Sequence, residues 1–240
     1  MASSLLRPLS IGEILDGAFT IYRKKFTTLV GMALICMLPS VLLFFVEPLA
    51  GTLVQYIGNL VVSIAGVWLV SEVVLGREAS IGDGLRVGAK MLIPFLAAGI
   101  LYGVGITIAT MLLIIPGILF WFMAFAWMPV VVLEKKILFL TRSRELAKGV
   151  WGKIFIVSVI TWFLMLMPAL FVVGGAAVVG DLNTTTGEMP AMFMAINSIV
   201  TALTMPFASA TVVLLYYDQR VRKDGLDVEL STASIGEAAV

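Results

Sequence analysis

The sequence contains no histidine, a single cysteine and few charged residues. Lysine, arginine, aspartate and glutamate make up 13% of its 240 residues, whereas soluble domains usually contain about 25%. Without histidine, the chain lacks the commonest metal ligand and the usual proton carrier near neutral pH. Cys36 has no partner for an internal disulfide, and we expect its side chain to pack as a small apolar residue. We therefore predict no metal site, no cofactor and no enzymatic activity.

Long apolar runs dominate the remaining sequence, which is 60% hydrophobic and has a mean hydropathy of +1.08. A helix needs about 20 apolar residues to cross a hydrocarbon core about 30 Å thick. Such runs lie near residues 27–46, 52–75, 92–115, 117–133, 153–179 and 190–217. The sequence therefore predicts an all-α polytopic membrane protein with six transmembrane helices.

The positive charges predict how these helices are oriented. All 16 lysine and arginine residues fall before the first run, in alternate loops or after the last run. The only charged residues of the intervening loops are the acidic residues Glu47, Asp181 and Glu188. Because lysine and arginine are retained on the cytoplasmic side of a membrane, we expect both termini to be cytoplasmic.

A short polar phrase recurs in front of the first and third runs. Ser-Ile-Gly begins at Ser10 and at Ser80, and an acidic residue follows three positions later, Glu13 or Asp83. This spacing is typical of a helix-capping box. Residues 11–26 then show the helical spacing of an amphipathic helix at a membrane surface.

A weaker copy of this surface segment, 140–151, precedes the fifth run. We predict three parallel units, near 10–75, 80–133 and 138–217, each a cytoplasmic interfacial helix followed by a transmembrane hairpin. Because the matched phrases are short, chance similarity remains the alternative. Together the units form one domain, 1–223, and we expect residues 224–240 to be a disordered cytoplasmic tail.

Neutral polar side chains form stripes on the second and sixth predicted helices. The helical spacing places the members of each stripe on one face: Gln55, Asn59 and Ser63 on the second helix, and Asn197, Thr201 and Thr204 on the sixth. Such stripes commonly serve helix packing through interhelical hydrogen bonds. The alternative is a polar seam for a lipid headgroup or a small solute. The fourth run carries aromatic residues instead, and we expect it to face lipid.

No span has an ionisable residue near its centre, which disfavours proton-coupled transport. Basic residues gather next to the spans, and we expect Arg23, Lys24, Lys25, Lys135 and Lys136 to contact anionic lipids. Juxtamembrane clusters of this kind recognise lipid headgroups. We predict no nucleic-acid partner and identify no protein partner.

Several segments resemble a known family. The stretches "LRPLSIGEILDGAFTIYRKKF", "LLIIPGILFWFMAFAWMPVVVLE", "LTRSRELAKGVWGKIF" and "LLYYDQRVRKDG" are similar to the bacterial integral-membrane family named after the membrane domain of glycerophosphoryl diester phosphodiesterase. The resemblance implies a protein of the bacterial cytoplasmic membrane. In that family the phosphodiesterase is a separate soluble barrel with histidines and metal-binding carboxylates, and this chain has neither histidine nor length for such a barrel.

We therefore expect a non-catalytic membrane protein that interacts with lipid or is accessory to a membrane process. The alternative is a transporter or channel for a small solute or lipid. This alternative would use the polar faces of the second and sixth helices.

Overall fold

The computed structural model describes residues 5–178 and 190–226, apart from the side chains of 176–178. Every regular element in these residues is helical. The helices are α2 (Ile11–Lys24), α3 (Phe26–Leu43), α4 (Pro48–Val74), α5 (Ile81–Leu112), α6 (Ile114–Met123), α7 (Trp127–Leu133), α8 (Leu140–Ala147), α9 (Trp151–Val178) and α10 (Ala191–Asp224).

The structure contains six helical segments that are long and apolar enough to cross a membrane. They are α3, α4, α5, α6 together with α7, α9 and α10, and each contains most of one predicted run. The predictions of an all-helical fold and of six candidate spans are confirmed. Residues 227–240 lie outside the described residues, so most of the predicted tail does too. However, α10 extends to Asp224, the first residue assigned to that tail.

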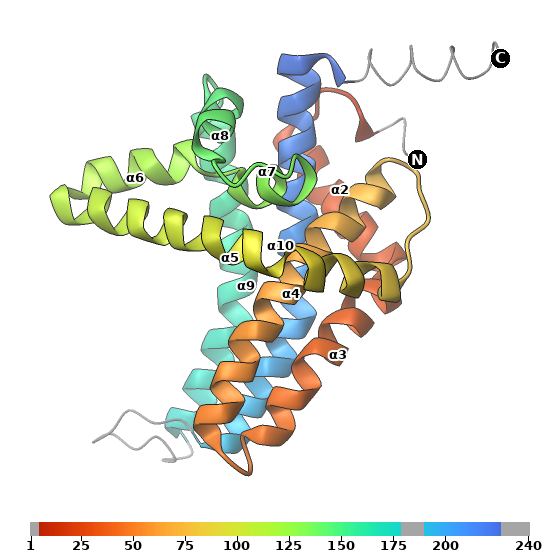
Figure 1. Cartoon of the computed structure of the whole chain (residues 1–240), viewed down its shortest axis with the longest axis vertical. Helices are drawn as coiled ribbons and strands as arrows, with labels where there is room; N and C mark the ends of the chain where they lie inside the picture. The colour runs from red at the N-terminus through yellow and green to blue at the C-terminus, as the bar shows by residue number, and fades with distance from the viewer. Residues whose placement is uncertain (1–4, 179–189, 227–240) are drawn as a thin grey trace.

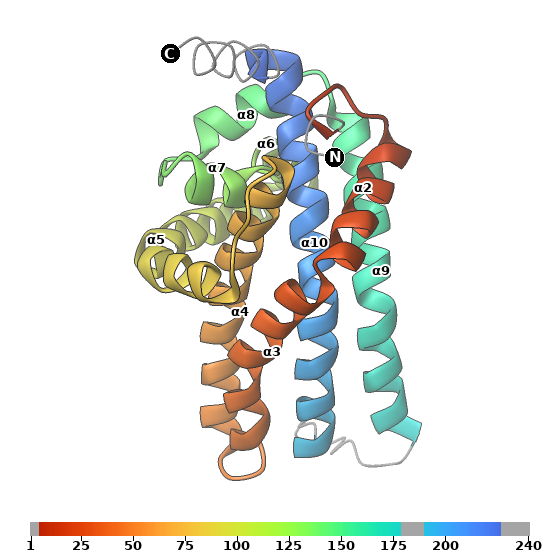
Figure 2. The same cartoon turned by 90° about the vertical axis from the view of Figure 1, so that its right-hand side faces the viewer.

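The candidate spans do not all share one direction. In Figure 1, α3, α4, α9 and α10 run along the long axis of the molecule, whereas α5 and α6 form a hairpin that runs across it. Figure 2, turned by 90°, shows α5 nearly end-on beside the same upright helices. The sequence predicts three parallel units with equivalent hairpins. In the structure, the α5–α6 hairpin of the middle unit is oriented differently from the helices of the other two units.

Capping boxes begin α2 and α5, as the sequence predicts. The Ser10 hydroxyl accepts a hydrogen bond from the Glu13 amide, and the Glu13 carboxylate accepts one from the Ser10 amide. Ser80 and Asp83 make the same reciprocal pair. The hydrogen bonds from the Ser10 backbone and side chain, with one from Arg7, lower the pKa of Glu13 to about 2.

The predicted fourth span is broken between α6 and α7. At the break, the amide of Ala126 donates to the hydroxyl of Ser143 in α8, at 3.1 Å. Trp127, the first residue of α7, stacks on Tyr102 of α5 with ring centroids 5.3 Å apart. It also lies 4.9 Å from the ring of Phe95. The prediction that the aromatic residues of this segment face lipid is therefore wrong for Trp127.

Helices α4 and α10 form the centre of the bundle. Residues 62–67 of α4 and 209–219 of α10 are buried apart from Val212, which is half-buried. Glycines allow α4 to approach its neighbours closely. A Cβ atom at Gly66 would lie 2.8 Å from the Ser209 hydroxyl, and one at Gly58 would lie 2.9 Å from the backbone carbonyl oxygen of Cys36 in α3.

The contact at Gly58 predicts the effect of adding one methyl group. Gly58→Ala should lower the free energy of unfolding by about 1–3 kcal/mol, because the α3 backbone must move to admit the methyl group. Gly103→Ala is the matched control, since a Cβ atom there has no neighbour within 4 Å. The control should be neutral or stabilising by up to about 1 kcal/mol, because alanine favours helix more than glycine does. Denaturant unfolding in one detergent measures both, and equal effects would contradict the packing described.

Candidate functional site

A cavity of about 350 Å³ lies between the α6–α7 segment, α9, α10 and the middle of α4. It is partly open to the surroundings. Its lining combines aromatic, methionine and hydroxyl side chains and includes no charged residue. The lining residues are Ser63, Trp121, Phe125, Trp127, Met128, Val157, Ser158, Thr161, Trp162, Met165, Met205, Ala208, Ser209, Thr211, Val212 and Leu215.

The hydroxyl groups of this cavity are mostly engaged by their own helices. Thr161 donates to the carbonyl of Val157 at 2.8 Å, and Thr211 donates to the carbonyl of Phe207 at 3.0 Å. Ser63 makes the same kind of bond four residues back. A hydroxyl needs an adjacent base to become a nucleophile, and the lining of this cavity places no charged side chain beside these hydroxyls.

A second cavity, of about 400 Å³, lies between α2, α9 and α10. Its lining is mainly apolar, with Phe19 and Tyr22 of α2 facing residues of α9 and α10. Tyr22 donates a hydrogen bond to the carbonyl of Leu203 at 3.1 Å. Met165 of α9 lines both cavities, so the two cavities adjoin at this residue.

The predicted polar stripes are not joined into one seam. Ser63 lines the first cavity and Thr204 lines the second. Within α10, Thr201 donates to the carbonyl of Asn197 at 2.8 Å, and Thr204 donates to that of Val200 at 2.9 Å. Gln55 and Asn59 are half-buried in α4 and line neither cavity.

One described hydrogen bond does join the side chains of α4 and α10, but it lies outside the predicted stripes. It links the hydroxyls of Ser71 and Tyr217 at 2.7 Å. Two polar atoms remain buried without a hydrogen-bond partner closer to the other end of these helices. They are Oδ1 of Asn59 and the hydroxyl oxygen of Ser198.

The basic residues predicted to contact lipid lie outside the two cavities. The guanidinium of Arg23 is 5.7 Å from the centre of the Phe19 ring in α2, and Lys24 and Lys25 end the same helix. Lys135 and Lys136 follow α7 and are exposed. Lys136 forms an ion pair with Glu134 at 3.0 Å.

Asp218 of α10 is fully buried and is the meeting point of several donors. Its carboxylate accepts hydrogen bonds from the Leu9 amide at 2.7 Å, Lys153 Nζ at 2.6 Å, Gln219 Nε2 at 2.7 Å and Arg222 Nε at 2.9 Å. Lys153 and Arg222 also donate to the carbonyl of Leu9. One carboxylate thus holds together the segment before α2, the first turn of α9 and the last part of α10.

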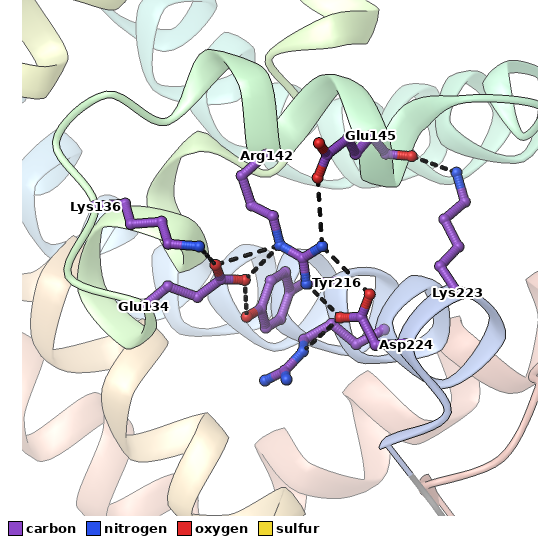
Figure 3. Close-up of polar contacts among 8 residues, drawn as sticks. Glu134, Lys136, Arg142, Glu145, Tyr216, Lys223 and Asp224 are labelled. Carbon is purple, nitrogen blue, oxygen red and sulfur yellow. Dashed lines mark hydrogen bonds and ion pairs between the residues drawn. The ribbon is translucent and has the colours of Figure 1, made fainter.

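A second charged cluster joins the ends of α7, α8 and α10 (Figure 3). Glu134 accepts hydrogen bonds from Tyr216 at 2.9 Å and from Arg142 at 3.0 Å, and Arg142 also pairs with Asp224. Burial alone raises the pKa of Glu134. The hydrogen bonds from Lys136, Arg142 and Tyr216 outweigh burial, so the pKa lies below its ordinary value.

Sequence reasoning did not identify Asp218 or Glu134 as organising residues. Both lie just beyond the predicted spans, where a charged residue usually meets water or headgroups. One available signal was the spacing of Asp218 and Arg222, which favours an ion pair across one helical turn. The partners Leu9 and Lys153 are distant in the chain, and no local pattern indicates them.

Comparison with family models, with curated proteins and with solved structures finds no match to this chain.

Proposed function

We propose that this chain is a non-catalytic, lipid-binding protein of the bacterial cytoplasmic membrane. The observation that carries the proposal is the uncharged cavity of about 350 Å³ between α7, α9 and α10. Its volume falls within the roughly 300–1,000 Å³ of ordinary ligand pockets. An acyl chain is the ligand that an apolar, aromatic lining without charge favours.

The proposed topology follows from the positive charges, with both termini in the cytoplasm. In this orientation, Arg23, Lys24 and Lys25 at the end of α2 face the anionic headgroups of the inner leaflet. Lys135 and Lys136 lie on the same side. We also propose α2 as an interfacial helix, because Phe19 of α2 remains exposed beside this basic cluster, as does Phe26 at the start of α3.

We also propose that the chain contains the internal repeat of three units and belongs to the family that its sequence resembles. Capping boxes at Ser10 and Ser80 support a shared origin for the first two units. The third unit lacks this support, because no side chain caps α8. Membership of the family named after the glycerophosphoryl diester phosphodiesterase membrane domain is proposed from the sequence stretches alone.

Filling the cavity tests the lipid-binding proposal. Ser158→Phe should lower the amount of lipid that copurifies with the protein by about tenfold, which corresponds to about 1.4 kcal/mol of binding free energy. Ile160→Phe is the matched control, because Ile160 lies on the same helix, is exposed and does not line the cavity. Native mass spectrometry of both variants in one detergent identifies and counts the bound lipids. Equal lipid retention by the two variants would contradict the proposal.

A transporter for a small solute is the second candidate, and the unpaired atoms of Asn59 and Ser198 favour it. A buried polar atom without a partner costs about 1–3 kcal/mol, and a passing solute or water molecule would offer that partner. The polar faces of α4 and α10 would then form its path.

The Asn59→Leu variant distinguishes a role of this side chain in transport from a role in helix packing. If α4 lines a path, this variant should abolish swelling of proteoliposomes in isosmotic glycerol while leaving the unfolding transition unchanged. Thr52→Val is the control, because the Thr52 hydroxyl is bonded within α4 to the carbonyl of Pro48 and so has a partner, unlike Oδ1 of Asn59. Swelling that persists in Asn59→Leu, or swelling and stability that fall together, would reject the transporter.

A further inference from the structure

The α5–α6 hairpin contacts α4 near its base, and Tyr102 farther along α5 stacks on Trp127 of α7. Cβ atoms built at Gly84 and Gly88 of α5 would lie 2.9 Å from Leu69 and 2.8 Å from Val61 of α4. Leu69 lies in the half of α4 that ends at Val74, and Val61 lies at the midpoint of the helix. On the other side of the hairpin, Phe122 stacks on Trp151, the first residue of α9. The hairpin therefore joins the bundle in the half where α4 ends and α9 begins.

Beyond Tyr102, which also contacts Phe139, the two arms of the hairpin pack on each other. Cβ atoms built at Gly105 and Gly117 would meet Phe120 and Thr110, which belong to the opposite arm. The tip has no cover within the described part of the chain. Met111 is 83% exposed and Ile114 is 72% exposed. The two arms extend away from the bundle and across its axis (Figures 1 and 2).

The composition of the hairpin indicates what surrounds it. No charged residue occurs between Met91 and Leu133, and the exposed side of α5 carries the bulky aliphatic residues Ile93, Ile100, Val104 and Ile108. Helix pairing within membranes uses mainly small or polar residues, so this surface is better suited to acyl chains than to a second copy of the protein. Along α5 and α6 the backbone polar groups are bonded within the helices, as hydrocarbon requires, except at the helix ends, where no side chain caps the start of α6.

We propose that the α5–α6 hairpin does not cross the bilayer but lies within one leaflet, among its acyl chains. The leaflet is the one on the side where α10 ends, because α5 meets α4 in that half. Basic residues next to both arms, Lys90 and Lys135 among them, lie near the headgroups of this leaflet. This inference rests on the proposed membrane orientation of α3, α4, α9 and α10. It does not rest on a lipid in the cavity.

Depth measurements along two helices test the proposal. Single cysteines replace Ile93, Ile100 or Ile108 in α5, in a Cys36→Ala background, and carry nitroxide labels in proteoliposomes. The outer two positions are separated by roughly 22 Å along the helix, at 1.5 Å per residue. Collision with oxygen and with a water-soluble nickel chelate reports the depth of each label. A hairpin within one leaflet gives nearly equal depths at the three positions.

Exposed positions of α9 provide the matched control, with labels at Phe155, Phe163 or Phe171. For an upright helix, oxygen collision should peak at Phe163 and fall at both ends. If α5 shows the same rise and fall as α9, the hairpin crosses the bilayer and the proposal is overturned. Line broadening in α5 labels that disappears on dilution with unlabelled protein would instead show a second copy over this surface, and would overturn acyl chains as its occupant. Neither result alters the lipid count of the cavity variants, so the two proposals fail separately.

Discussion

The arrangement of α9, α10 and the segment before α2 depends on the hydrogen bonds and ion pairs that the buried carboxylate of Asp218 accepts. Removing a charge from water costs several kcal/mol, and a buried ion pair offsets this only when further hydrogen bonds satisfy it. Asp218 meets this condition, because two cationic side chains, an amide side chain and a backbone N–H donate to it. Two of the helices that it joins, α9 and α10, line both cavities.

The contacts of Asp218 fix the ends of α9 and α10, so the cavity beside α10 needs no charged residue to hold these helices together. Charge is concentrated at one end of the bundle, in the clusters around Asp218 and Glu134, where it fixes the helix ends. Farther along α9 and α10, the side chains between the helices are apolar or carry hydroxyls bonded to their own backbone. Aromatic, methionine and hydroxyl side chains therefore line the space between these helices without any charged residue, and this is the space that we propose for an acyl chain.

The sequence predicted the helices well because the physics behind them is local. Apolar runs of sufficient length must satisfy their backbone groups internally, and Ser10 and Ser80 mark two helix starts through contacts within three residues. The orientation of α5 was not predictable, because its charge-free part from Met91 to Leu112 has the same hydropathy whether it crosses a bilayer or lies within a leaflet. The cavity was not predictable either, since Ser63, Trp127 and Thr161 belong to distant helices.

A double-mutant cycle on Asp218 and Lys153 tests most directly whether this carboxylate holds α9 against α10. Asp218→Asn alone should lower the free energy of unfolding in detergent by about 3–5 kcal/mol, because it leaves the largely buried ammonium group of Lys153 without its partner. In the Asp218→Asn background, Lys153→Met should lower the free energy of unfolding by less than it does in the wild-type chain. The difference is the coupling energy, which we expect to be about 0.5–3 kcal/mol. Losses that simply add would show that the two side chains act independently, and would contradict the central role given to Asp218.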